Sequence, residues 1–154
     1  MFSRAKLLFS LILLSLISFQ AQAHHIVVKN AWIPEAPPVS KVLAAFMVIE
    51  NNSDQIEEIV AIESDDFDHV EMHLSQEVDG VAKMMPQKSL VIPAKGQLEL
   101  KPGSYHLMLY TPKRSLKAGE TSRLTLTLKS GKKFNIKAMV KQASGMMMHN
   151  HDHH

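Results

Sequence analysis

From residue 26 to residue 140 the chain consists of short β-branched and aliphatic runs separated by Gly, Pro, Asn and Asp. This pattern is typical of many short strands, because helices need apolar residues at a period of 3.6 over longer stretches. We therefore predict an antiparallel, all-β fold in one domain. The expected strands are Ile26 to Ile33, Val42 to Asn51, Gln55 to Glu63, His69 to Glu77, Val81 to Met85, Gln97 to Leu100, His106 to Tyr110, Ser122 to Lys129 and Lys133 to Val140.

Two dipeptides between these runs predict hairpin turns. Asp79-Gly80 and Ser130-Gly131 are both common in tight connections between antiparallel strands. Before the second turn, three Leu residues alternate with Thr over 124–128, which predicts one buried face and one wet face. Such a strand suits the wall of a sandwich or barrel. The prolines after Ile33 predict an extended loop from Pro34 to Ser40.

The first 23 residues have the features of an export signal. Arg4 and Lys6 precede an apolar run from Leu7 to Phe19, and Ala21-Gln22-Ala23 supplies a small-x-small cleavage pattern. We predict cleavage before His24, a domain over residues 24–143, and a periplasmic location in a Gram-negative envelope. The apolar run is shorter than the roughly 20 residues of a membrane helix, so no stable membrane insertion is expected after cleavage.

Charge and cysteine content exclude several functions. The chain has 17 Lys+Arg and 15 Asp+Glu, and two of the basic residues lie in the predicted signal, so the remainder is formally neutral. A neutral domain has no electrostatic basis for binding nucleic acid. The absence of cysteine excludes disulfides, a cysteine-linked lipid and an ordinary blue-copper site, whose short Cu–S bond needs a thiolate.

Four residues suggest a metal site: His73, Met84, His106 and Met108. Thioether sulfur is a soft ligand and imidazole suits copper, so this combination favours Cu(I). A two-residue turn at 79–80 would place Met84 opposite Ser75 and diagonal to His73. His106 and Met108 lie two residues apart on a strand, so their side chains emerge on the same face. Leu residues occupy the opposite, inward face. Without a role in metal binding, His106 and Met108 would be expected to be exposed with no evident purpose.

Other histidines and methionines are assigned more ordinary roles. A methionine in a β protein is usually part of the core, so Met47, Met72, Met85 and Met139 are expected to pack, with Met72 and Met85 also near enough to be rim ligands. His69 is expected to be a surface histidine.

The ligand spacing resembles that of the PCu(A)C family of periplasmic copper chaperones, which help to load the CuA centre of cytochrome c oxidase. The segments that carry the resemblance are Glu71-Met72-His73, Asp79-Gly80-Val81-Ala82-Lys83-Met84, Ile92-Pro93-Ala94-Lys95-Gly96, Leu100-Lys101-Pro102-Gly103 and His106-Leu107-Met108-Leu109. The resemblance implies a cupredoxin-like β-sandwich or barrel and the same four residues as Cu(I) ligands. It also implies a copper-accepting partner, either an oxidase subunit carrying CuA or a thiol protein. Met85 stands where many relatives have Arg.

The C-terminal residues form a distinct segment, 144–154, that we expect to be a flexible tail. It is rich in thioether and imidazole groups and could bind copper a second time, including Cu(II). A purification tag is the plainer explanation, but Asn150, Asp152 and the preceding methionines argue against it. The candidate secondary ligands are Met146, Met147, Met148, His149, His151, His153 and His154.

Two other functions could use copper ligands of this chain, and a third has little support. A copper-buffering or resistance protein could use the same four ligands without a dedicated acceptor. A copper oxidoreductase could use His24, because a terminal amine and imidazole chelate Cu(II), although no internal histidine is tied to it by spacing. A hydrolase has little support, since no nucleophile motif is present. We therefore expect a non-enzymatic copper carrier.

Overall fold

The structure is a computed structural model that describes residues 25–142, where it contains ten β-strands and no helix, and hence no helix that could cross a membrane. Two strands start two residues away from their predicted positions, at Glu57 instead of Gln55 and at Phe67 instead of His69, and the short strand Leu90–Ile92 was not predicted. The strands are β1 (Ile26–Pro34), β2 (Val42–Asn51), β3 (Glu57–Glu63), β4 (Phe67–Val78), β5 (Val81–Gln87), β6 (Leu90–Ile92), β7 (Gly96–Leu100), β8 (Tyr105–Pro112), β9 (Thr121–Leu128) and β10 (Lys133–Lys141).

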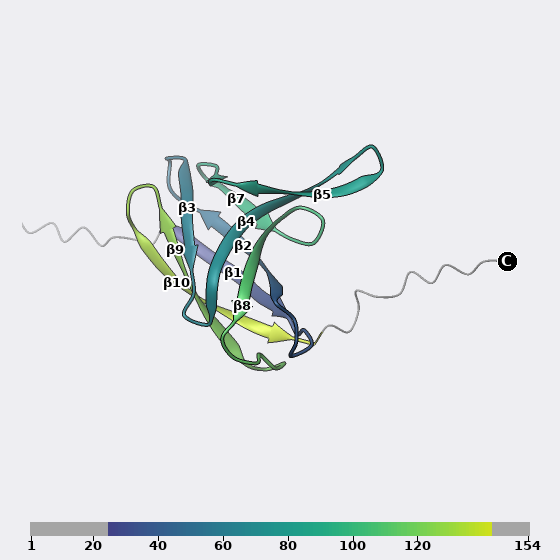
Figure 1. Ribbon diagram of the computed structural model, residues 1–154. Coiled ribbons are helices and arrows are strands. Elements are labelled where there is room, and N and C mark those ends of the chain that lie inside the picture. The colour runs from purple at the N-terminus through teal and green to yellow at the C-terminus, as the bar shows by residue number, and fades with distance from the viewer. Residues whose placement is uncertain (1–24, 143–154) are drawn as a thin grey trace, which may run out of the picture.

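The strands form one continuous sheet in the order β5-β4-β8-β2-β1-β10-β9-β3-β6, with β7 also paired to β2 (Figure 1). β2 pairs with three strands: with β1 along one edge and, along the other, with β8 through Val42 to Ala45 and with β7 through Met47 to Asn51. The two halves of β2 thus pair with different strands, and the sheet curls around a common core. The predicted all-β, cupredoxin-like sandwich or barrel is confirmed.

One strand pair departs from the predicted antiparallel arrangement. β1 and β10 run parallel, with Trp32 opposite Met139 and Ile33 opposite Val140. The prediction was wrong here because it considered only neighbours joined by hairpins, which must be antiparallel. Strands that meet without a direct turn, such as the first and last, are free to run in the same direction.

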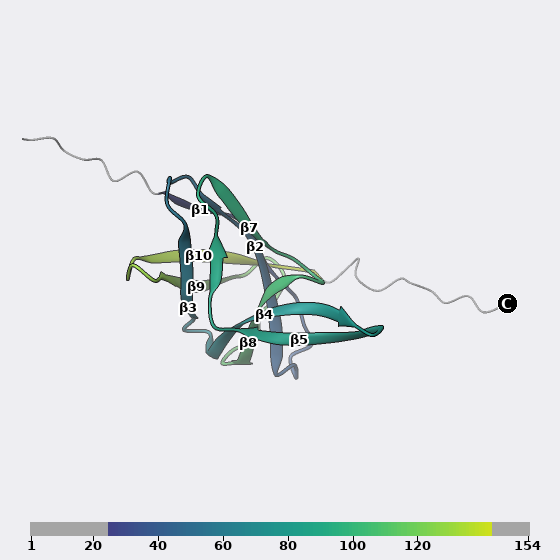
Figure 2. The same ribbon diagram turned by 90° about the horizontal axis from the view of Figure 1, so that it is seen from above.

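Both predicted hairpins are present, since β4 pairs antiparallel with β5 and β9 with β10. Asp79 and Gly80 have φ of 54° and 73°, the paired positive values of a type I′ turn, and Ser75 lies opposite Met84 as expected. β5 is an edge strand, which is why it tolerates Pro86. Figure 1 shows the tip of the β4–β5 hairpin extending beyond the rest of the sheet, and Figure 2 shows it from above on the side away from the β9–β10 turn.

Alternation along the strands builds the core. Leu124, Leu126 and Leu128 on β9 are buried, and the intervening Thr residues are only partly buried. Met47 and Met72 belong to the core, as predicted. The same prediction was wrong for Met85 and Met139, which are 39% and 50% exposed. Met139 falls on the outer face of β10, and Met85 lies on a strand where six of the seven residues are exposed.

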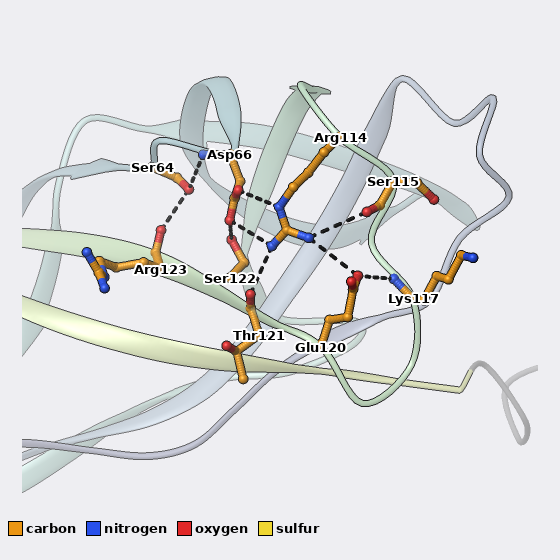
Figure 3. A network of polar contacts seen from close by, with 9 residues as sticks. All are labelled: Ser64, Asp66, Arg114, Ser115, Lys117, Glu120, Thr121, Ser122 and Arg123. Atoms are coloured by element: carbon orange, nitrogen blue, oxygen red, sulfur yellow. Dashed lines mark hydrogen bonds and ion pairs between the residues drawn. The ribbon is translucent and has the colours of Figure 1, made fainter.

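A polar network ties the start of β4 to the loop after β8 (Figure 3). Arg114 donates to both carboxylate oxygens of Asp66, at 2.8 Å and 3.3 Å, and Ser122 donates to the same carboxylate at 2.8 Å. Arg114 also contacts Glu120 and the carbonyl of Thr121. Hydrogen bonds from Arg114 lower the pKa of Asp66 below its ordinary value of 3.8. The network anchors β4 and β8, the two strands that carry the candidate site.

We predict that Asp66→Asn lowers the free energy of unfolding by about 1–2 kcal/mol at pH 7, a value that allows for the partial exposure of Arg114. A lowered carboxyl pKa stabilises the fold above the ordinary value and loses that effect as pH falls through the folded pKa. The difference between the two proteins should therefore shrink at pH 3. Urea unfolding at pH 7 and pH 3 measures it.

Asp54→Asn is the matched control, because Asp54 pairs with Lys95 at a site where its side chain is 84% exposed. Its effect should stay within about 0.5 kcal/mol. An equal loss of stability for Asp66→Asn at both pH values would contradict the proposed charge contribution.

Candidate metal centre

The candidate ligands on β4 and β8 are brought together by strand register. The two strands pair antiparallel, so that three cross-strand pairs stack along one face, here called the site face. This face lies opposite the one that contributes Met72, Leu107 and Leu109 to the core. The three pairs are His73 with His106, Glu71 with Met108, and His69 with Tyr110.

Met84 reaches the same region from β5. Together with His106 and Met108 it lines a cavity of about 430 Å³. Val42 and Phe46 of β2 form part of its apolar wall. Met84 is 61% exposed on the projecting hairpin, whereas Met108 is half-buried. Three of the four predicted ligands therefore share one cavity.

His73, the fourth predicted ligand, lies directly beside His106. Their ring centroids are 5.9 Å apart, with 38° between the ring planes. Both residues are buried, at 6% and 4% exposure. The expectation that the face bearing His106 would be exposed is therefore wrong. Phe46 and the Pro102–Gly103 segment border the cavity beside His106, and a pattern of alternating residues does not reveal such long-range cover.

Each imidazole has one nitrogen fixed and one nitrogen without a partner. Nδ1 of His106 lies 3.0 Å from the carbonyl of Ser104, which can only accept, so Nδ1 carries the proton. Nε2 of His73 lies 2.8 Å from a Glu71 carboxylate oxygen and likewise donates. The remaining nitrogens, Nδ1 of His73 and Nε2 of His106, are buried and make no hydrogen bond. In neutral rings both would present a lone pair.

This arrangement is typical of histidines that bind metals. Such histidines usually donate the second ring N–H to a carboxylate or a backbone carbonyl, which sets the tautomer and orients the ring. A buried nitrogen without a partner is costly unless a ligand satisfies it. His73 and His106 each donate one ring N–H to an oxygen and each bury the other nitrogen without a partner. Their unpartnered nitrogens therefore fit a metal ion.

Two residues that were not predicted for the site contribute to its polar surroundings. The carboxylate of Glu71 lies 3.7 Å from Nε2 of His69, and hydrogen bonding from His73 is the main cause that lowers the pKa of Glu71. Tyr110 Oη donates to the Met108 sulfur across 3.7 Å. Burial, followed by the charge of Glu71 and a hydrogen bond to its carboxylate, raises the pKa of Tyr110, so its hydroxyl stays protonated. The Glu-x-His spacing of residues 71 and 73 on one strand could have indicated the first contact.

The side chain of His69 is 55% exposed, in agreement with the predicted surface position. It also stacks on Tyr110, with ring centroids 4.4 Å apart and planes within 5°. This contact could not be anticipated, because it depends on the pairing of β4 with β8.

The donor set matches a soft metal better than a hard one. Within residues 25–142, no group of three or more His, Cys, Asp or Glu side chains is placed to hold an ion. The candidate site in this part of the chain differs from such clusters because it includes thioethers, and two imidazoles with two thioethers would suit Cu(I).

Several sequence predictions lie outside the described residues. These are the signal peptide over residues 1–23, the oxidoreductase ligand His24, and the secondary ligands from Met146 to His154.

Comparison with known proteins identifies the family to which this chain belongs. The family model described as "Putative lipoprotein LpqE-like" matches residues 26–140. A "Putative lipoprotein" of Leifsonia xyli subsp. xyli is 31% identical over 125 residues, which span 80% of this chain and 74% of the relative.

Two solved structures are similar to the whole strand domain. The solution structure of Cu(I)-bound DR1885 from Deinococcus radiodurans has a TM-score of 0.61 at 33% identity, covering 80% of this chain and 83% of the other. A copper-bound PCuAC domain from PmoF2 has a TM-score of 0.66 at 18% identity, covering 77% and 93%, and at that identity shows the fold alone. The chain therefore belongs to the LpqE-like family, which is of the PCuAC type.

Proposed function

We propose that this protein is a copper carrier that binds Cu(I) through His73, Met84, His106 and Met108. The observation that carries the proposal is the pair of buried imidazole nitrogens without partners, each on a ring whose other nitrogen is held by a hydrogen bond. The Cu(I)-bound form of DR1885 supports it, since that protein is 33% identical over most of both chains.

The ligand set suits transport better than permanent storage. Thioethers have no proton to lose, so half of the proposed ligands are insensitive to pH, whereas a neutral histidine is required for binding. The carrier contains no cysteine, and Cu(I) favours thiolate over thioether and imidazole. Transfer to a thiol-containing acceptor would therefore be downhill.

The positions of the two thioethers suggest where exchange begins. Met84 is 61% exposed on the projecting hairpin, so an acceptor thiolate can reach this side of the metal first (Figure 1). The two histidines are buried and oriented by hydrogen bonds, so they would release copper last. Successive replacement of ligands avoids a free copper ion at any stage.

The cellular role that fits this chemistry is delivery of copper to the CuA centre during assembly of cytochrome c oxidase. The lipoprotein descriptions of the family and of the Leifsonia relative support an exported, envelope-associated protein, and we propose the periplasm as its location. The acceptor would be the oxidase subunit or an assembly protein with thiols. We propose a carrier and not an enzyme.

We predict that the wild-type protein binds one Cu(I) in a shell that contains both sulfur and nitrogen. His106→Ala and Met108→Ala should each weaken Cu(I) binding by at least about 10-fold, because the loss of a ligand should cost no less than the loss of its supporting contact. Competition titrations with a Cu(I) chelator and X-ray absorption of the bound copper provide the measurements.

Met139→Ala is the matched control for methionine loss, since Met139 is half exposed on the outer face of β10 and lies outside the cavity. Its Cu(I) affinity should equal that of the wild type. A copper shell without sulfur in the wild type would rule out the assignment.

We predict that the copper-loaded protein transfers its metal to a reduced dithiol acceptor and that a deletion strain loses oxidase assembly. Transfer is followed by separating the two proteins and measuring the copper in each. Retention of copper by the carrier would exclude direct transfer. Copper sensitivity with normal oxidase in the deletion strain would favour buffering over delivery.

For the C-terminal segment we propose a second, weaker copper site that includes Cu(II). Deleting residues 146–154 should lower the Cu(II) stoichiometry and leave one Cu(I) bound, because the four main ligands remain. Isothermal titration with each oxidation state tests this. An unchanged Cu(II) titration would refute a site in this segment.

A further inference from the structure

We propose that Tyr110, held in place by stacking on His69, is a positioning residue that orients the Met108 thioether before copper arrives. The proposal rests on the proposed function for its consequence, but the contact itself exists in the protein without metal. It assigns different tasks to the two thioethers: Met108 is set in advance, and Met84 is free to exchange.

The contact between Tyr110 and Met108 follows from their spacing on β8. Both side chains project from the site face, and the phenol oxygen lies 3.7 Å from the Met108 sulfur. A thioether is a weak acceptor with two lone pairs. One lone pair can receive the Tyr110 proton while the other remains available to a metal in the cavity that Met108 lines. The carboxylate of Glu71, the cross-strand partner of Met108, is a second acceptor within reach of the same hydroxyl, so the Met108 resonance in Tyr110→Phe is the readout specific to the sulfur contact.

The Tyr110 ring is itself restrained. It stacks on His69, its direct cross-strand partner, at 4.4 Å between ring centroids and nearly parallel. His69 in turn approaches the Glu71 carboxylate, which lies between His69 and His73 on β4. A ring held on one face by His69 has a defined hydroxyl position, so the hydrogen bond to sulfur can select a conformation of Met108.

Methionine gains most from such restraint, because it has several rotatable bonds and loses much freedom when it is fixed in place. Among residues 25–142, Met108 is the methionine whose sulfur accepts a side-chain hydrogen bond, whereas Met84 stands largely exposed on the hairpin. If Met108 is already ordered in the metal-free protein, copper binding loses less side-chain entropy, and the affinity for copper should be about threefold to tenfold higher. Met84 would keep the freedom needed to let an acceptor in.

Tyr110→Phe tests the proposal, because it keeps the stacked ring and removes only the hydroxyl. In the metal-free protein labelled with ¹³C-methyl methionine, the Met108 methyl resonance should move toward that of Met84 as the side chain gains rotamers. The same substitution should weaken Cu(I) binding by about threefold to tenfold with one copper still bound. His69→Ala should shift the Met108 resonance in the same direction, since the phenol ring loses its stacking partner.

Tyr105→Phe is the matched control. Tyr105 lies on the same strand but on the opposite face, packed against the core, so it should leave both the Met108 resonance and the Cu(I) affinity unchanged. A Met108 resonance that does not move in either Tyr110→Phe or His69→Ala would overturn the positioning role. Failure of the wild type to bind Cu(I) would instead refute the proposed function, a result that the metal-free spectra do not depend on.

Discussion

The register between β4 and β8 is the constraint on which the candidate site depends. It sets His73 opposite His106 and Met108 opposite Glu71, so that one face of two neighbouring strands carries both imidazoles, a thioether and a supporting carboxylate. A shift by one residue would turn these side chains toward the core and the Leu residues toward the cavity. The apolar core therefore constrains the site geometry, because burial of Leu107 and Leu109 excludes a slip by one residue.

The hydrogen bonds around the two imidazoles determine which ring nitrogens are available to a metal. Ser104 and Glu71 each accept from one ring nitrogen and leave the other with a lone pair in a buried place. Burial without a partner is unfavourable for the metal-free protein, and the soft cation that we propose here would relieve it. The proposed function thus carries a cost in stability at the two histidines, because each ring keeps one nitrogen unpartnered in the metal-free protein.

The thioethers divide into a fixed and an accessible member. Met108 is half-buried on a central strand and contacts Tyr110, whereas Met84 belongs to an edge hairpin that extends from the sheet. The carrier that we propose would need both properties, since its metal would have to stay bound during diffusion and still be open to attack by an acceptor. A central strand beside an edge hairpin supplies them in one sheet.

Much of this protein could be determined from the sequence alone. Alternation and turn residues specified nine of the ten strands and the β4–β5 register that places Ser75 opposite Met84, because these depend on local periodicity and chain connectivity. The four candidate ligands were proposed from the chemistry of their side chains and from the spacing that the chain shares with the PCu(A)C family. The parallel pairing of β1 with β10, the burial of His106 and the stacking of His69 on Tyr110 were decided by tertiary structure. Each of these depends on strands that no turn connects, and no local pattern records which of them become neighbours.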